Sequence, residues 1–584
     1  MHDIIGAYQR IDHIYKLYIR SAFPMRYRVL AQEREEILNR RGLLSQPPLI
    51  EPVPVYESSR KNLTQAAQEL PGYEDLAHLG QTLFPSELEL YQHQWESLEA
   101  VCKHQKDIVV TTGTGSGKTE CFLLPLLAQL AKESKTWDAC PPPPDNHRWW
   151  DVPDNTTPTF QKQWSHAKRP QAIRALVLYP LNALVEDQLR RLRLSLEAPK
   201  IHNWLDQSRG RNRVTFGRYT GLTPVSGEQK KHTVKKLQDE LRDCENNWQS
   251  TQDSQTISQN PDIQYYFPRL DGGEMRSRWD MQATPPDILI TNYSMLNIMM
   301  MRQIEQDIFD KTKEWLESDP ENQFFLIVDE LHSYRGTPGT EVAYLLRLLY
   351  HRLGLTADSP QLRILTTTAS LDDSQDGRRF LTEFFGRDNF EFIDQPQVQP
   401  VQDARHWVKD YQAAFAQFAH TVDPHPTEKD TLTQADVPDS AMRALAQELG
   451  CTDESLEAKA QLWTALKQLG IEKSEGAKEA LRDACQAVNN GEVRATCITE
   501  LDPILFPNAK HDDQLISDAL RGFLMALGIA QSDKQFLQPV RGHLFFHNLE
   551  NIWACSNPDC TDPSCDPTQR QQPDTKPTIG ALHE

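Results

Sequence analysis

The sequence predicts an α/β protein built on a doubly wound parallel sheet that carries a phosphate-binding loop. Two observations predict this class. First, an apolar strand at residues 108–111 runs into a glycine-rich turn, and a helix-forming segment follows at 120–130. Second, short apolar strands alternate with helical segments between residues 175 and 367, and each strand ends in small polar residues. Because strands joined through helices run parallel, helices should cover both faces of the sheet.

The chain before this domain, residues 1–79, should be a helical region followed by a linker. Residues 1–42 should form one or two amphipathic helices, because apolar side chains recur there at helical spacing: Ile4, Ile5, Tyr8, Ile11, Ile14 and Tyr15. Residues 47–54 begin and end in proline and should be an extended connector. A further helical stretch is expected over residues 62–79.

The glycine-rich turn has the composition of a phosphate cradle. Three glycines within residues 112–119 let bare backbone approach phosphate oxygens, and the following helix adds the positive end of its dipole. Lys118 should reach the β- and γ-phosphates, and the hydroxyl of Thr119 should ligate Mg²⁺. We expect ATP to contact the whole loop: Thr112, Gly113, Thr114, Gly115, Ser116, Gly117, Lys118 and Thr119. Thr112 stands where such loops usually begin with glycine, and a turn without a ligand is the alternative.

An acidic pair completes the predicted chemistry. The apolar run 324–328 is a buried strand that delivers Asp329 and Glu330 at its carboxyl end. Asp329 should hold Mg²⁺ through water, and Glu330 should orient and deprotonate the attacking water. Together with Lys118, these two carboxylates are the predicted catalytic residues.

Gln94 lies shortly before the phosphate loop and is a candidate for recognition of the base. Its amide can donate to one ring nitrogen of adenine and accept from the amino group. The alternative is the solvated start of a helix.

Two polar segments interrupt the strand series and should be insertions. Residues 133–170 contain four consecutive prolines and the pair Trp149-Trp150, and residues 222–280 contain a predicted helix at 227–248. The tryptophans could stack on nucleic-acid bases. The favoured alternative is that they pack the insertion onto the domain. With these insertions, the α/β domain should extend over residues 80–398.

The chain after residue 398 shows no second strand–helix series. Residues 399–535 should be a helical accessory region, with helices expected at 404–421, 439–449, 455–469, 474–489 and 512–527. Residues 536–584 contain Cys555, Cys560 and Cys565, whose spacing could begin a tetrahedral zinc site. The set is one ligand short, although His543 or His547 could contribute. A thiol cluster without metal is the alternative.

The composition limits the compartment and the partners. Ten cysteines, mostly scattered singly, and the lack of a recognisable signal peptide predict a reducing, cytoplasmic location. No apolar stretch reaches the length needed to span a bilayer. The formal net charge of −20 argues against a surface coated with basic groups for duplex DNA. It leaves open a local groove that holds a single strand.

Seven motifs resemble, in order and spacing, the first RecA-like domain of superfamily 2 DExH-type (DEAD/DEAH box) helicases. They are QHQ at 92–94, TTGTGSGKTE at 111–120, LVLYPLNALVEDQ at 176–188, YTG at 219–221, DILITNYSML at 287–296, LIVDELH at 326–332 and TTTAS at 366–370. The tail resembles the cysteine module found between the two motor domains of certain long bacterial helicases. Two departures are Leu331 in the acidic box and the order Thr-Ala-Ser at 368–370, where Ser-Ala-Thr is usual.

The resemblance implies ATP-dependent movement along a nucleic-acid strand, with DNA as the expected substrate. It assigns the strand-backbone contacts to Pro180, Asn182, Thr220, Gly221, Thr291 and Asn292. It assigns coupling between the two sites to His332, Thr368 and Ser370. Large bacterial helicases of this kind act in DNA repair or in defence against phage.

The second RecA-like domain of such enzymes supplies arginines that stabilise the transferring phosphate. We therefore expect this chain to be the N-terminal motor half, which needs that missing domain or a second, C-terminal chain. Two alternatives remain: a non-catalytic subunit of a split helicase that binds ATP and nucleic acid, and a phosphate-loop ATPase that does not act on nucleic acid.

Overall fold

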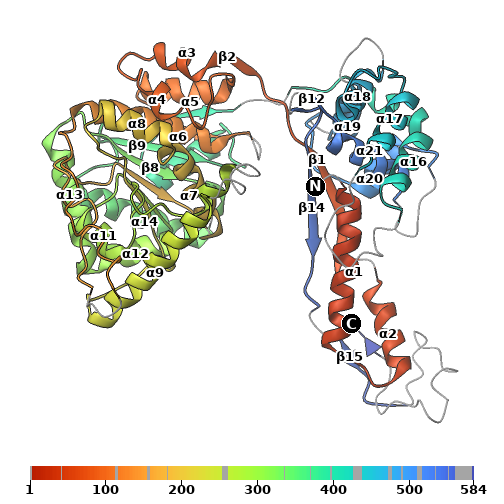
Figure 1. Cartoon of the computed structure of the whole chain (residues 1–584), viewed down its shortest axis with the longest axis horizontal. Coiled ribbons are helices and arrows are strands. Elements are labelled where there is room, and N and C mark those ends of the chain that lie inside the picture. The colour runs from red at the N-terminus through yellow and green to blue at the C-terminus, as the bar shows by residue number, and fades with distance from the viewer. Residues whose placement is uncertain are drawn as a thin grey trace. The chain divides into compact units, whose positions relative to one another are not determined.

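The chain divides into two compact units (Figure 1). The structure is a computed structural model that describes all residues except 1–2, 41, 112–115, 154–157, 181, 253–260, 335, 369, 395–397, 425–436, 471–475, 488–490, 510–515, 533–534, 550–551, 559–581 and 584. One unit comprises residues 56–396 and is called the sheet unit below. The other combines residues 1–55 with 397–584 and is called the helical unit.

A seven-stranded parallel sheet forms the centre of the sheet unit, with the strand order β10-β4-β9-β8-β5-β7-β6. The strands are β4 (Asp107–Val110), β5 (Ala175–Leu178), β6 (Phe216–Tyr219), β7 (Ile288–Thr291), β8 (Phe324–Val328), β9 (Leu362–Thr367) and β10 (Phe390–Ile393). Every residue of β4, β5, β7, β8 and β9 is buried, which explains why most of their residues are apolar. The predicted α/β fold class, a RecA-like doubly wound parallel sheet, is confirmed.

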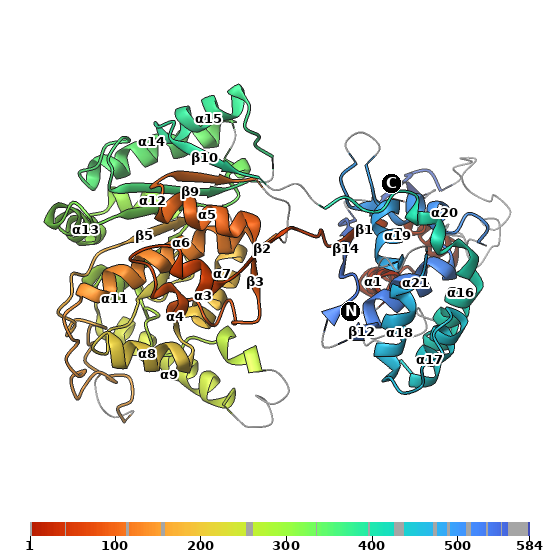
Figure 2. The same cartoon turned by 90° about the horizontal axis from the view of Figure 1, so that it is seen from above.

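Helices cover both faces of this sheet (Figures 1 and 2). Alternate residues of a strand enter different cores: Ile108 and Val110 of β4 belong to one, and Val109 belongs to the other. The first core includes α3 (Leu63–Gln68), α4 (Leu76–Leu79), α5 (Gln92–Cys102), α6 (Lys118–Glu133), α7 (Asn182–Leu196) and α8 (Pro199–Ser208). The second includes α11 (Arg278–Ala283), α12 (Tyr293–Met301), α13 (Gln306–Ser318), α14 (Gly336–Arg352) and α15 (Gln375–Phe385).

The two predicted insertions pack against each other. Trp149 and Trp150 of the first contact the buried apolar residues of α9 (Lys231–Ser250) and Trp279 in a small separate core. The indole Nε1 of Trp150 donates to Glu245 of α9 at 3.0 Å. Both tryptophans are buried, so the structure supports the packing role rather than stacking on bases.

Short elements complete the sheet unit. Near its start, β2 (Ser58–Asn62) pairs antiparallel with β3 (Glu89–Tyr91). Short 3-10 helices lie at η1 (Ser134–Thr136), η2 (Pro261–Tyr266), η3 (Gln303–Glu305) and η4 (Leu331–Ser333).

The helical unit brings the beginning of the chain together with its last part. The predicted N-terminal helices are α1 (Ile4–Ala22) and α2 (Arg28–Leu38). A buried ion pair of 3.0 Å joins Arg10 of α1 to Asp423, and Arg521 holds Asp3 at 2.7 Å. The expected connector at 47–54 is extended, but most of it belongs to β1 (Ser45–Pro52), which lies between β11 (Thr496–Cys497) and β14 (Val540–Phe546).

The remaining helices of this unit are α16 (Gln412–Val422), α17 (Asp439–Glu448), α18 (Ala458–Lys467), α19 (Gly476–Ala484), α20 (Ile498–Leu505) and α21 (Asp518–Ile529). The 3-10 turns η5 (Ala404–Trp407) and η6 (Lys409–Tyr411) precede α16, where the sequence predicted one continuous helix. Short strand pairs are β12 (Gln531–Ser532) with β13 (Gln535–Phe536), and β15 (Trp553–Ala554) with β16 (Leu582–His583).

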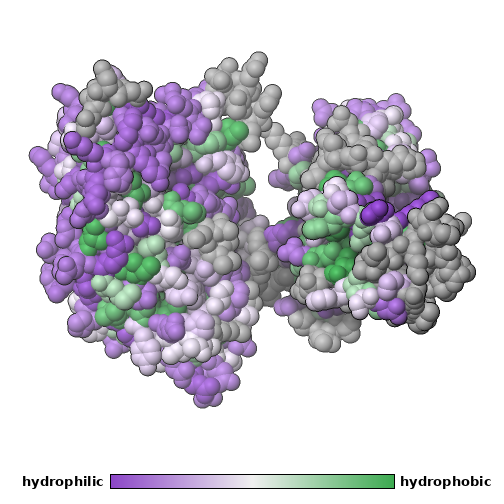
Figure 3. All heavy atoms as spheres, turned by 90° about the horizontal axis from the view of Figure 1, so that it is seen from below, coloured by the Kyte–Doolittle hydropathy of each residue, from purple (hydrophilic) through white to green (hydrophobic). Residues whose placement is uncertain are grey.

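Much of the surface in Figure 3 is hydrophilic, in keeping with a sequence in which 25% of residues are charged. Among the described helices, none is both long and apolar enough to cross a membrane.

Candidate functional site

The phosphate loop connects β4 to α6. The residue directly before the helix must be a glycine, and it is Gly117. Thr112, Gly113, Thr114 and Gly115 lie outside the described residues. Gly117 caps the N-terminus of α6 with a φ of 80°, a backbone conformation that favours glycine. A Cβ atom there would lie 2.3 Å from Nε2 of Gln94, so a side chain would collide with the neighbouring helix.

Two side chains of α5 lie within hydrogen-bond distance of carbonyl oxygens in the loop. Nε2 of His93 lies 2.8 Å from the carbonyl oxygen of Ser116, and both residues are fully buried. Gln94 accepts a hydrogen bond from the backbone N–H of Tyr91 at 3.0 Å, and its Nε2 lies 3.5 Å from the carbonyl oxygen of Gly117. The amide of Gln94 therefore lies beside the loop, and its contact with adenine stays a prediction.

Lys118 occupies the first turn of α6 with a buried ammonium group. No atom in the described part of the chain accepts a hydrogen bond from its Nζ. A buried cation without a partner is costly, because neither water nor a carboxylate replaces its lost hydration. An anion at the loop would remove this cost.

Asp329 follows β8 and is held at the sheet edge by hydrogen bonds. The hydroxyl of Thr367 donates to Oδ1 of Asp329, and the backbone N–H of Glu330 donates to the same oxygen at 3.1 Å. Burial raises the pKa of Asp329, while Thr367 and Lys118 act to lower it. Lys118 therefore lies close enough to Asp329 to act on its charge.

Glu330 has a left-handed backbone, with a φ of 52°. Non-glycine residues rarely adopt this conformation, and it concentrates at functional sites. Its carboxylate remains partly exposed, and Nδ1 of His332 lies 3.3 Å from Oε2. The predicted catalytic carboxylate and the predicted coupling histidine are thus in contact.

The sequence did not identify three side chains that support this site: His93, Gln188 and Thr367. Nε2 of Gln188 on α7 lies 3.5 Å from the hydroxyl oxygen of Thr119. The register of the sheet could have indicated Thr367, because Val328 pairs with Thr366 and the next residues are Asp329 and Thr367. His93 and Gln188 depend on helix packing that no local pattern encodes.

The sequence profile of the DEAD/DEAH box helicase family matches residues 91–225, which include the phosphate loop. This segment starts just before Gln94 and ends after β6. The chain carries a DEAD/DEAH box helicase domain.

The chain is similar to a number of known proteins and solved structures, and three of them are described below. The Druantia protein DruE of Escherichia coli (strain UMEA 4076-1) is 29% identical over 614 aligned positions, which cover 96% of this chain and 30% of DruE. A crystal structure of the DUF1998 helicase MrfA bound to DNA is 17% identical, with a TM-score of 0.32 over 67% of this chain and 39% of that chain. A second, bound to DNA and AMPPNP, is 15% identical, with a TM-score of 0.32 over 74% and 44%. The chain therefore spans about a third of the length of DruE.

In the helicase domain, the predicted nucleic-acid residues lie at the carboxyl ends of the neighbouring strands β5, β7 and β6. The hydroxyl of Thr291 donates to the carbonyl oxygen of Tyr219 at 2.7 Å, and that of Thr220 accepts from the N–H of Leu222 at 3.3 Å. Both threonines are buried. Their hydroxyl groups therefore form hydrogen bonds to the backbone at this edge of the sheet and stabilise it.

Pro180, Gly221 and Asn292 are more accessible at this edge. Gly221 is exposed and Pro180 is partly exposed. Asn292 caps α12 by accepting from the N–H of Met295 at 2.8 Å. Asn182 is the first residue of α7.

The predicted coupling residues Thr368 and Ser370 follow β9. Thr368 is buried, and its N–H donates to the carbonyl oxygen of Val110 at 3.0 Å, at the end of β4. The N–H of Ser370 lies 3.4 Å from the hydroxyl oxygen of Thr368. This segment is thus attached to the strand that leads into the phosphate loop.

The structure describes one of the three tail cysteines. Cys555 is partly exposed just after β15, and Cys560 and Cys565 lie outside the described residues. His543 is paired with Glu51 at 2.7 Å. Within the described ranges, no group of three or more histidine, cysteine or acidic residues is arranged to hold a metal.

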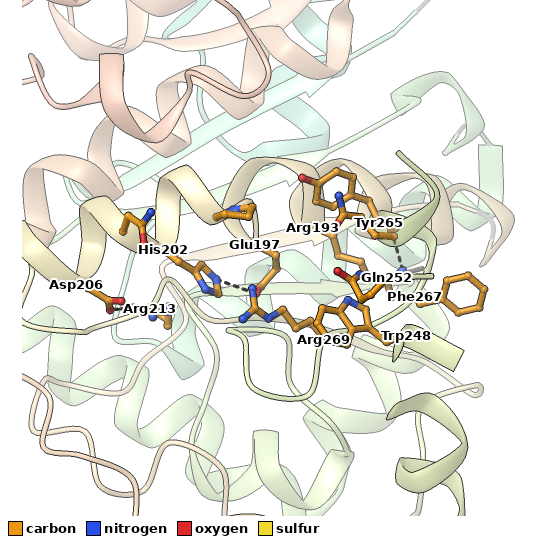
Figure 4. A pocket seen from close by; sticks show the side chains of 13 residues that line it. Arg193, Glu197, His202, Asp206, Arg213, Trp248, Gln252, Tyr265, Phe267 and Arg269 are labelled. Carbon is orange, nitrogen blue, oxygen red and sulfur yellow. Dashed lines mark hydrogen bonds and ion pairs between the residues drawn. The ribbon is translucent and has the colours of Figure 1, made fainter. Parts of the chain in front are cut away.

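A separate cavity of about 400 Å³ lies where α7, α8, α9 and η2 meet (Figure 4). Its cationic side chains are paired with carboxylates: Arg193 with Glu274, His202 with Glu197, Arg213 with Asp206 and Arg269 with Asp271. Because carboxylates of the protein pair with these cationic side chains, the charges that line the cavity do not indicate a charged ligand.

Proposed function

We propose that this chain is the first motor domain of an ATP-dependent DExH-type helicase or translocase that acts on nucleic acid, with DNA as its substrate. The observation that carries the proposal is the buried ammonium group of Lys118, which has no acceptor among the described residues and lies close to Asp329. A triphosphate at the loop would supply the missing anion, and Asp329 would supply the acidic group that a bound metal needs.

The surrounding residues fit ATP and Mg²⁺. Gly117 keeps the backbone open where a Cβ would meet Gln94, and α6 directs its N-terminal dipole toward the loop. Thr119 and Asp329 would hold Mg²⁺, which usually keeps several waters and takes one or two protein ligands. The ion, when bound, would neutralise charge on the phosphates.

Glu330 is the group that would accept the proton of the attacking water. Its carboxylate is partly exposed, and the backbone turn at φ 52° fixes its position after β8. A carboxylate held at a fixed point beside the metal site needs little reorganisation before proton transfer.

We further propose that nucleic acid lies along the carboxyl ends of β5, β7 and β6. Ligands of open α/β sheets bind at this edge. Gly221 and Pro180 would contact the strand backbone, and a grip on phosphates lets a motor move without regard to base sequence.

A second RecA-like domain would complete the motor. In the helical unit, the described strands form only sheets of two or three strands. The arginines that stabilise phosphoryl transfer would therefore come from another domain or chain. The role of a non-catalytic subunit is the second candidate, because the chain aligns with only 30% of DruE.

ATP hydrolysis and ATP binding, each measured with and without single-stranded DNA or RNA, separate these candidates. We expect nucleotide binding that responds to single-stranded DNA, with weak or no turnover by this chain alone. Strong DNA-stimulated turnover would contradict the need for a second domain. Nucleotide binding that no nucleic acid alters would favour a phosphate-loop ATPase with another substrate.

The tail cysteines are a separate proposal. We propose that Cys555, Cys560 and Cys565 contribute to a zinc site, on the strength of their spacing alone. Zinc content of the purified chain, compared with Cys555→Ser, tests this. Equal zinc in both proteins would remove Cys555 from the site.

A further inference from the structure

Helix α7 links the proposed nucleic-acid edge to the nucleotide loop. It starts at Asn182, close after Pro180 at the end of β5. Its Arg191 contacts Glu120 in the first turn of α6 at 2.5 Å. A movement of α7 at the sheet edge would therefore reach the helix that begins at the phosphate loop.

Glu120 is an unusual neighbour for a phosphate site. It lies two residues after Lys118, and its Oε2 would be only 3.2 Å from a Cβ on Gly117. A carboxylate this close to the loop would repel the negative phosphates of ATP, and the low polarity of a half-buried position strengthens that repulsion. The charge of Glu120 must be neutralised for tight ATP binding.

Arg191 supplies this neutralisation. The pair is only partly exposed. Burial is the largest single influence on the pKa of Arg191 and lowers it, but Glu120 and Asp187 together raise the pKa above its usual value. Arg191 is also held by Asp187, one turn earlier on α7, at 3.0 Å. Because this second carboxylate anchors the guanidinium to its own helix, Arg191 would move with α7 and leave Glu120 uncovered.

We propose that Arg191 is a positioning residue that neutralises Glu120 and makes ATP affinity depend on the position of α7. Contact of a nucleic-acid strand with the start of α7 would then be transmitted to the nucleotide loop. This inference rests on the proposed ATP and nucleic-acid sites. Helix α7 would then couple the ATP site to the nucleic-acid site separately from the segment that contains Thr368 and Ser370.

The test is a charge-based double-mutant cycle in the full chain. The dissociation constant of a fluorescent, non-hydrolysable ATP analogue is measured with and without an unlabelled thymidine oligonucleotide. The proteins are wild type, Arg191→Gln, Glu120→Gln and the double variant. Arg190→Gln is the matched control, because Arg190 lies on the same helix but faces Asp262 and Tyr266 of the second insertion.

We expect Arg191→Gln to weaken analogue binding by about fivefold and the double variant to return to within about twofold of wild type, because the repelling charge is then gone. Arg190→Gln should leave the affinity unchanged. The oligonucleotide should change the wild-type affinity, and this change should disappear in both variants that lack Arg191.

Three outcomes would overturn the inference. The double variant could bind as weakly as Arg191→Gln, which would indicate loss of packing. The oligonucleotide could bind wild type without altering its affinity for the analogue, or its effect could survive without Arg191. A wild-type chain that binds no analogue, or no oligonucleotide, would instead contradict the proposed function itself.

Discussion

Thr367 on β9 donates the hydrogen bond that fixes Oδ1 of Asp329 at the end of β8. The N–H of Glu330 lies 3.1 Å from both that oxygen and the hydroxyl oxygen of Thr367. One hydroxyl group therefore positions the acidic pair through a neighbouring strand. The segment that begins with Thr366, Thr367 and Thr368 therefore helps to hold the two carboxylates in place.

Replacing Thr367 with valine should impair metal-dependent nucleotide binding. The change keeps the side-chain volume but leaves Asp329 without its hydroxyl donor in a buried position, which costs about 1–3 kcal/mol. We expect a higher Mg²⁺ concentration for half-maximal binding of an ATP analogue. Thr367→Ser keeps the hydroxyl group and should stay close to wild type. Equal loss in both variants would mean that packing, not the hydrogen bond, matters.

Replacing Lys118 with methionine should have opposite effects on ATP binding and on stability. The change removes an ammonium group that is buried without an acceptor in the described structure, so the free energy of unfolding without nucleotide should rise by about 1–2 kcal/mol. Affinity for ATP should be lost. Urea unfolding and nucleotide titration measure the two effects. Lys132→Met at the other end of α6 is the control. Retained ATP affinity would show that the site lies elsewhere.

The sheet and the loop were predictable because their signals are local. Val109 and Val110 lie shortly before the first glycine of the loop, and Asp329 follows its strand directly. The supporting contacts are not local. His93 meets Ser116 from the preceding helix, and Arg10 meets a carboxylate 413 positions away. Such contacts depend on which elements pack together, and no short pattern of residue types encodes that.

The packing of the two insertions against each other is also encoded by no short sequence pattern. Trp150 is almost fully buried against residues of α9 and accepts, through its carbonyl oxygen, a hydrogen bond of 3.0 Å from Gln238. Trp150→Ala should destabilise the sheet unit by about 3–5 kcal/mol. Nucleotide affinity below the unfolding transition should change little. Quenching of Trp150 fluorescence by single-stranded DNA, absent from Trp150→Phe, would instead support base stacking.

Asp287 should make the stability of the sheet unit depend on acid pH. The carboxylate is fully buried just before β7, receives two hydrogen bonds of 2.6 Å from Arg169 and lies 3.0 Å from Arg174. Burial alone would raise its pKa, but the two arginines outweigh burial and hold the pKa below the usual 3.8. A group whose pKa is lower in the folded state stabilises it above the unfolded pKa. That stabilisation is lost as the pH falls through the folded pKa.

Asp287→Asn should therefore lower the free energy of unfolding by about 3–5 kcal/mol near neutral pH, because the buried Arg169 loses its charged partner and Arg174 keeps only Glu133. The difference from wild type should stay constant above about pH 5 and shrink below about pH 4, where the unfolded chain takes up the proton. Urea unfolding at a series of pH values measures this. Asp206→Asn, which removes a more exposed partner of Arg213, should cost less than about 1 kcal/mol. A difference that persists unchanged into acid would mean that Asp287 contributes through hydrogen-bond geometry and not through its charge.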